Sequence, residues 1–274
     1  MKILDGRALA AQIKSQLKEE VAKLGKIPGL AAVLVGNNEA STLYVGLKEK
    51  ACQETGIYFE KLVFGADIPQ KKLIEEIQKL NKRDEIHGIL VQIPLPKHLN
   101  EDVVIATIDP KKDVDGFHPK NLSLMQQKNH YIIPGVALGI FELIKNSNID
   151  LKNKKAALLV NSEIFATPIK YLLEKSGSVV ETIIRPTEIK TSVSEADILI
   201  VALGKPKVIT EAMVKLGAVV IDVGTNKVNG KLVGDVDFEN VKNKALAITP
   251  VPGGVGPMTV AMLLFNTIKL VKQN

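Results

Sequence analysis

Short runs of consecutive apolar residues alternate with segments of helical periodicity along most of the chain. The run at residues 156–160, AALLV, has no polar position, which is typical of a parallel strand covered on both faces. Strands that alternate with helices in this way favour an α/β fold with parallel sheets. The predicted strands are residues 30–35, 58–64, 88–91, 156–160, 179–184, 198–202 and 218–222, and the predicted helices are residues 41–55, 70–82, 168–175, 210–215 and 259–272.

A segment without sustained periodicity, between Asp109 and Gly135, separates two such α/β units. The 274 residues of the chain are enough for two domains of modest size. The last predicted helix follows a loop rich in proline and glycine. It could return to the first unit, which would make that domain discontinuous in sequence.

Composition excludes several classes of protein. Lys and Arg number 36 against 30 Asp and Glu, but the excess is spread in short clusters, which indicates solvated faces and not a nucleic-acid patch. The single Cys52 excludes an internal disulfide and a Cys-rich zinc site. The longest apolar runs have six residues, where a membrane span needs about 18. We therefore expect a cytoplasmic protein that binds neither nucleic acid nor membranes.

Two segments place polar side chains where a ligand could reach them. Tyr44 and Lys48 are four residues apart on a predicted helix, so their side chains share one face. A Lys moved into a drier site loses part of its preference for charge and can transfer protons near neutral pH. Gln92 ends a buried strand just before Pro94 and Pro96, and ligands of open α/β sheets bind beyond the carboxyl ends of strands. Each feature alone also fits a surface pair or a strand-end hydrogen bond.

Acidic and glycine-rich segments leave similar alternatives open. Asp113 and Asp115 flank a valine before Gly116, so either carboxylate could cap the turn or point into a cleft. The loop at residues 250–257 is either a rigid turn or a place where backbone approaches a ligand. The four histidines, His87, His98, His118 and His130, lack metal-ligand spacing and are expected to be structural or on the surface, so we expect no metal.

Taken together and in order, these segments resemble the methylenetetrahydrofolate dehydrogenase/cyclohydrolase family over essentially the whole chain. The resemblance depends on YVxxK at residues 44–48, VQxPLP at 91–96, KDVDG at 112–116 and PGGVGPMT at 252–259. It implies a folate-binding catalytic domain at residues 1–120 plus 259–274, and a Rossmann-like NAD(P)-binding domain at residues 121–258. It also implies a homodimer with a folate cleft between the two domains.

The family's reactions imply roles for particular residues. The family oxidises the methylene bridge of tetrahydrofolate with NADP and hydrolyses the methenyl product to 10-formyltetrahydrofolate. By this resemblance Lys48 transfers protons, Gln92 holds Lys48, Tyr44 stacks on the substrate, and Asp115 accepts hydrogen bonds from the pterin. The implied substrate-binding residues are Tyr44, Val91, Gln92, Leu95, Asp115, Pro252, Gly253, Gly254 and Val255.

The second domain departs from the family's pattern at the predicted cofactor turn. The family has Gly-Arg-Ser-x-x-Val-Gly where this chain has residues 160–166, VNSEIFA, and Ile184 stands where a histidine is usual. Val160 and Ala166 add a Cβ where glycine would let a phosphate approach, and Asn161 lacks the charge of arginine. The predicted cofactor-binding residues are Val160, Asn161, Ser162, Arg185, Thr187 and Thr225.

These departures leave three functional hypotheses. The first is the bifunctional enzyme that uses NADP. The second is a cyclohydrolase whose NADP-dependent dehydrogenase activity is weak, altered or lost. The third is a non-catalytic subunit that binds folate, against which the presence of Lys48 argues.

Overall fold

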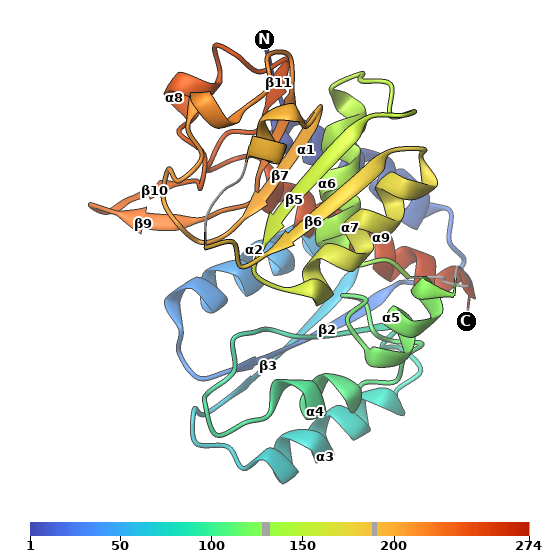
Figure 1. Cartoon of the computed structure of the whole chain (residues 1–274). Helices are drawn as coiled ribbons and strands as arrows, with labels where there is room; N and C mark the ends of the chain where they lie inside the picture. Colours follow the sequence, from blue (N-terminus) through green and yellow to red (C-terminus); the bar gives the residue numbers. More distant parts are fainter. Residues whose placement is uncertain (128–131, 188–190, 274) are drawn as a thin grey trace. The chain divides into compact units, whose positions relative to one another are not determined.

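The computed structural model describes residues 1–127, 132–187 and 191–273, and it divides into two compact units (Figure 1). The three-stranded unit comprises Ala11–Gly135 and Val260–Asn274, and the six-stranded unit comprises Met1–Ala10 and Val136–Thr259. Both sheets are built of parallel strands with helices between them, so the predicted α/β class with two domains is confirmed.

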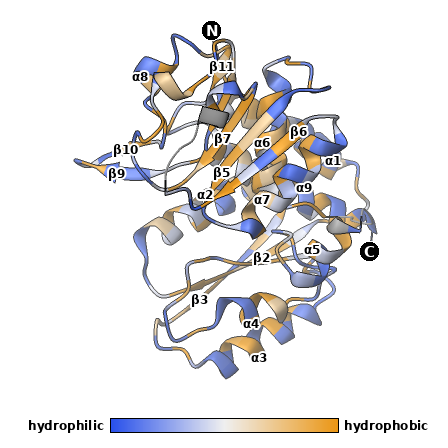
Figure 2. Ribbon diagram, in the orientation of Figure 1, coloured by the Kyte–Doolittle hydropathy of each residue, from blue (hydrophilic) through white to orange (hydrophobic). Residues whose placement is uncertain are grey.

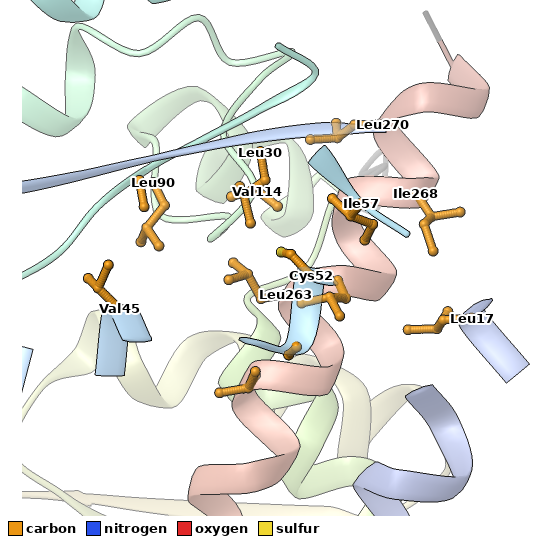
Figure 3. Packing of buried hydrophobic residues seen from close by; sticks show 14 of the residues in the cluster. Leu17, Leu30, Val45, Cys52, Ile57, Leu90, Val114, Leu263, Ile268 and Leu270 are labelled. Carbon is orange, nitrogen blue, oxygen red and sulfur yellow. The ribbon is translucent and has the colours of Figure 1, made fainter. Parts of the chain in front are cut away.

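In the three-stranded unit, the central strand β2 (Gly29–Val35) lies between β3 (Tyr58–Phe64) and β4 (Gly88–Val91). All seven residues of β2 are buried because both faces of the strand are covered. Leu30, Ala32 and Leu34 belong to one core cluster, part of which is drawn in Figure 3. Ala31, Val33 and Val35 belong to a second cluster. The helices of this unit are α2 (Glu39–Thr55), α3 (Gln70–Asn81), α4 (Glu101–Ala106), α5 (Pro119–Gln126) and the parts of α1 (Gly6–Ala22) and α9 (Val255–Gln273) beyond the unit boundaries.

The six-stranded unit has the strand order β1-β11-β8-β7-β5-β6, with all neighbours parallel. Its inner strands are almost wholly apolar, as Figure 2 shows for β5 and β7. The order reverses at β5, whose neighbours β6 and β7 lie on opposite sides, and ligands of such sheets bind at this point. The strands of this sheet are β1 (Lys2–Ile3), β5 (Lys155–Val160), β6 (Val179–Ile184), β7 (Ile198–Ala202), β8 (Val219–Asp222) and β11 (Ala247–Ile248). A separate hairpin is formed by β9 (Asn226–Val228) and β10 (Lys231–Val233). The helices are α6 (Gly135–Asn146), α7 (Glu163–Lys175) and α8 (Phe238–Val241), with the 3₁₀ turns η1 (Thr191–Glu195) and η2 (Glu211–Met213).

The division of the chain differs from the prediction at its N-terminus. We placed residues 1–120 in the catalytic domain, but β1 pairs with β11, and Met1–Ala10 group with the six-stranded unit. A two-residue strand carries too little periodicity to be recognised in a sequence. The three-stranded unit continues past residue 120 to Gly135, because α5 groups with it. The domain bounds that the resemblance implies stay a prediction.

Several predicted helices also differ from those observed. The helix predicted at 210–215 is the short 3₁₀ turn η2. The helix predicted to begin at Pro168 begins at Glu163, and Pro168 lies inside it. Helix α9 begins at Val255, four residues before the predicted start. Of the helices in the described ranges, α9 alone is long and apolar enough to cross a membrane, and 67% of its apolar window is buried, as in the core helix of a globular protein.

Candidate active site

A buried lysine lies at the carboxyl end of the three-stranded sheet. Lys48 belongs to the buried face of α2 and is 8% exposed. Its Nζ donates a hydrogen bond of 2.8 Å to Oε1 of Gln92, the residue after β4. Gln92 is itself fixed, because its backbone N–H donates to the carbonyl of Val33 and its Nε2 donates to the carbonyl of Ile93. The structure therefore brings together two residues that lie 44 positions apart in the chain.

Burial gives this lysine an unusual acidity. Removal from water disfavours the charged ammonium and lowers the pKa of Lys48, while the negative charge of Asp115 acts in the opposite direction. Gln92 accepts the hydrogen bond of the amine without bringing a formal charge. A lysine in this environment has a larger neutral fraction near neutral pH and can both accept and donate a proton.

The two acids of the KDVDG segment have different surroundings. Asp113 is 1% exposed, and its carboxylate accepts hydrogen bonds from the backbone N–H groups of Gly116 and His118. It therefore holds the turn. Asp115 is half-buried, and burial raises the pKa of its carboxyl to about 6, against the opposing attraction of Lys48. Asp115 is thus the acid whose charge acts on Lys48, a distinction that the residues alone left open.

Gly116 is required by the shape of this turn. Its φ of +79° lies in the left-handed region, and a Cβ there would meet the backbone nitrogen of Pro134 at 2.9 Å.

The remaining predicted substrate residues of the three-stranded unit differ in exposure. Tyr44 is 38% exposed on α2, one turn before Lys48, so its ring is accessible. Val91 and Leu95 are 5% and 8% exposed and belong to a core cluster. They shape the end of β4 chiefly by packing.

The predicted loop residues Pro252, Gly253, Gly254 and Val255 lie in the six-stranded unit. Pro252 is exposed and Gly253 is half-buried, with a φ of +115°. Gly254 and Val255 are buried, and the ideal position of a Cβ on Gly6 lies 1.8 Å from the carbonyl oxygen of Gly254. Glycine at position 6 therefore allows the start of α1 to lie against this loop.

The predicted cofactor turn lies between β5 and α7. The side chain of Asn161 donates from Nδ2 to the carbonyl of Leu203, which follows β7. The backbone carbonyl of Asn161 accepts a hydrogen bond from Nε of Arg185, which follows β6. Ser162 occupies the N-cap position of α7 but makes no side-chain capping bond. The turn thus joins the ends of three neighbouring strands and keeps a guanidinium beside the start of a helix.

Val160 and Ala166, the two residues predicted to obstruct a phosphate, lie in the interior of the unit. Both residues are 0% exposed. For the same reason Val160 offers no surface to a cofactor, contrary to its place among the predicted cofactor-binding residues. Thr187 and Thr225, which follow β6 and β8, are exposed.

Sequence reasoning missed the internal support of this region, a pair of buried carboxylates. Asp235 accepts from the backbone N–H groups of Leu203, Gly204 and Lys205 and from Nδ2 of Asn226. Asp222 accepts from the backbone N–H groups of Gly224, Asp235 and Val236, and burial raises its pKa to about 6. The sequence does carry a signal of this pair, because both acids stand close to a glycine, in DVG at residues 222–224 and in GDV at residues 234–236.

Three of the four histidines lie within the described residues, and each makes a local structural bond. Nδ1 of His87 accepts from the backbone of Gly29, His98 contacts the carbonyl of Ile68, and His118 caps the start of α5. His130 lies outside the described residues.

Fold and site together define a two-unit α/β protein, with a buried lysine bonded to a glutamine in one unit and a parallel sheet whose strand order reverses at β5 in the other. The family models agree. Residues 4–115 match the catalytic domain of tetrahydrofolate dehydrogenase/cyclohydrolase, and residues 134–274 match the NAD(P)-binding domain of the same family. The chain belongs to the tetrahydrofolate dehydrogenase/cyclohydrolase family.

Curated relatives and solved structures match over the full length. The bifunctional protein FolD of Sulfurihydrogenibium is 49% identical to this chain, in an alignment that covers 100% of this chain and 98% of the relative. The bifunctional FolD enzyme of Campylobacter jejuni is 44% identical, with a TM-score of 0.95 over 100% of this chain and 99% of its own. The Trypanosoma brucei enzyme, solved with NADP and an inhibitor, is 36% identical, with a TM-score of 0.93 over 99% of this chain and 97% of its own.

Proposed function

We propose that this protein is a bifunctional enzyme. It oxidises 5,10-methylenetetrahydrofolate to the methenyl cation with NADP and hydrolyses that cation to 10-formyltetrahydrofolate. The observation that supports this most directly is the buried Lys48, hydrogen-bonded to Gln92 and acted on by the charge of Asp115. Membership of the family, whose relatives are named as bifunctional enzymes, agrees with it.

The hydrolytic step requires proton transfer at a fixed point. Water adds to the electron-poor methenyl carbon and loses a proton, which gives a neutral tetrahedral carbinol. The hydroxyl of this intermediate then loses its proton as the formyl C=O forms, the bond to N5 breaks, and N5 gains a proton. The net change adds one water and releases one proton. Lys48 is suited to carry this proton in both directions because burial brings its acidity closer to neutral pH.

The residues around Lys48 orient the substrate. The ionised carboxylate of Asp115 accepts hydrogen bonds from paired N–H donors, such as the amino group and ring N–H of a pterin. The accessible ring of Tyr44 offers a flat surface for stacking. Val91 and Leu95 contribute apolar packing beside Gln92.

The turn after β5 fits an anionic dinucleotide. Ser162 leaves the first N–H groups of α7 without a side-chain cap, and a helix N-terminus with free N–H groups attracts phosphate. The guanidinium of Arg185 lies against the same turn, in a region where Asn161 has replaced the usual arginine. Asn161, Ser162, Arg185, Thr187 and Thr225 are the residues proposed to hold NADP, which supplies the hydride acceptor when bound.

The two activities are tested on one preparation. Purified protein is assayed for NADP-dependent formation of the methenyl cation at its absorbance band and for decay of that band on hydrolysis. Thermal unfolding is followed in parallel with increasing NADP or NAD, since a ligand of the folded state raises Tm with its concentration. Hydrolysis without nucleotide-dependent oxidation identifies the cyclohydrolase alternative, and folate binding without either activity identifies the non-catalytic subunit.

We further propose that the protein is a cytoplasmic homodimer. Strand β3 is an edge strand of the three-stranded sheet, with Tyr58 46% and Val63 58% exposed, and an unpaired edge with apolar side chains suits a second copy. Cys52 is a buried free thiol, which agrees with a reducing compartment such as the cytoplasm. Light scattering after gel filtration measures the oligomeric state, and cell fractionation tests the compartment.

A further inference from the structure

Two buried asparagines in the three-stranded unit have one hydrogen-bonding pattern in common. Asn121 on α5 is 3% exposed and Asn266 on α9 is 1% exposed. Each makes two hydrogen bonds from its amide nitrogen, at least one of them to a residue of the KDVDG segment. Each also leaves its own buried Oδ1 without a hydrogen-bond partner among the described residues.

The acceptors fix the orientation of both amides. Nδ2 of Asn266 donates to the carbonyls of Val114 and Ile133, at 3.0 and 2.9 Å. Nδ2 of Asn121 donates to the carbonyl of Pro110 and to Oδ2 of Asp113, both at 2.9 Å. All four partners can only accept, so the nitrogen must face them and the oxygen must face away.

An unpartnered buried carbonyl destabilises the folded state, and native structures contain few of them. An apolar side chain at position 266 would avoid this cost in the interior of a helix that is otherwise largely apolar. The amide of Asn266 instead fixes the backbone of the segment that contains Asp115.

The backbone on either side of Asp115 is held by a different residue. The carbonyl of Val114 accepts from Asn266, and the N–H of Gly116 donates to the carboxylate of Asp113, at 3.0 Å in each case. The backbone is therefore anchored on both sides of Asp115. Removing Asn266 frees one of these two attachments and takes away the donor that Asn266 supplies to the carbonyls of Val114 and Ile133.

We propose that Asn266 is a positioning residue of the active site, which holds the backbone next to Asp115 in place through the carbonyl of Val114. The expected effect on hydrolysis rests on the proposed function. The position of Asp115 itself depends only on the described contacts within the three-stranded unit, and we call this the geometric part of the proposal.

The test compares two neighbouring buried residues of α9. Asn266→Leu removes both donors at similar volume. Thr267→Val is the matched control, because Thr267 is 0% exposed and its hydroxyl donates only within the helix, to the carbonyl of Leu263. Asp115→Asn serves as the reference for loss of the charge that acts on Lys48.

The first readout needs no turnover. The titration of Lys48 is measured from the pH dependence of its modification by an amine-reactive reagent, followed by mass spectrometry. Asp115 raises the pKa of Lys48, so we expect Asn266→Leu to move the titration to lower pH, in the same direction as Asp115→Asn. Thr267→Val leaves the titration in place. An unchanged titration in Asn266→Leu overturns the proposal.

The second readout is the kcat/KM of methenyl hydrolysis. We expect Asn266→Leu to lose about tenfold or more, and Thr267→Val to stay within about twofold, at matched Tm losses. Equal kcat/KM in the two variants overturns the catalytic role. If Asn266→Leu does not fold, Asn266→Ser replaces it in both measurements. A wild-type protein that does not hydrolyse the cation contradicts the proposed function, whereas the Lys48 titration still decides the geometric part.

Discussion

Replacing Lys48 by methionine removes the amine but keeps most of the volume of the side chain. Proton transfer by a positioned group typically contributes about 10²–10⁴-fold to a rate, so we expect the kcat of methenyl hydrolysis to fall by that factor. Binding of the folate should change little, because Asp115 and Tyr44 remain in place. The assay is decay of the methenyl absorbance band, with folate affinity measured separately by calorimetry.

The structure also predicts a small effect of Lys48→Met on stability. Oε1 of the half-buried Gln92 loses its donor, at a cost of about 1 kcal/mol, but a buried amine no longer has to be taken out of water. The two effects oppose each other, and about 1 kcal/mol corresponds to only about 2–4 °C in Tm for a chain of this size class. Hydrolysis at the wild-type rate in a folded Lys48→Met protein would refute the role of the amine.

Further predictions concern the charges around both sites. The carboxyl of Asp115, with a pKa of about 6, gains its proton as pH falls through that value and then cannot accept two hydrogen bonds. KM for the folate should therefore rise by roughly tenfold per pH unit below about pH 6, and Asp115→Asn should abolish this dependence. Gln92→Glu adds a negative charge to the Lys48 amine and raises its pKa, so the pH profile of hydrolysis should move to higher pH; an unmoved profile contradicts the assigned contact. Asp235→Asn presents an N–H group to backbone donors and should reduce the NADP-induced rise in Tm while methenyl hydrolysis continues. Asn161→Arg should strengthen NADP binding relative to NAD in titrations, and equal gains for both nucleotides would argue against a 2′-phosphate contact.

The sequence carried enough signal to predict the interior strands because each is a short, uninterrupted apolar run between segments of helical periodicity. Residues 30–35 and 156–160 are apolar throughout, and the structure covers both faces of β2 and β5. The strand β1 was missed because two residues cannot show a period. Its place is set by pairing with β11, more than 240 positions away in the chain, which no local pattern reports.

The candidate site shows a similar division. Residue types and order were sufficient to select Tyr44, Lys48, Gln92 and the KDVDG segment, but which acid of that segment caps the turn is decided by burial and backbone hydrogen bonds. The burial of Val160 and Ala166 could not be predicted, because a sequence does not tell on which side of a turn a side chain lies. Asn266 was missed because one polar residue in an apolar helix has no meaning until its acceptors, 152 and 133 positions away, are known.

The chemical difference between Gln92 and Asp115 explains how one lysine can serve a step that both takes and returns a proton. A carboxylate bonded directly to Nζ would hold the ammonium form and oppose its deprotonation. Gln92 instead satisfies the amine through a neutral oxygen at 2.8 Å, and the negative charge acts on Nζ from Asp115, without replacing that bond. Burial lowers the pKa of Lys48, Asp115 limits how far it falls, and the balance depends on where the carboxylate lies. The backbone attachments on each side of Asp115 therefore bear on acidity as well as on shape.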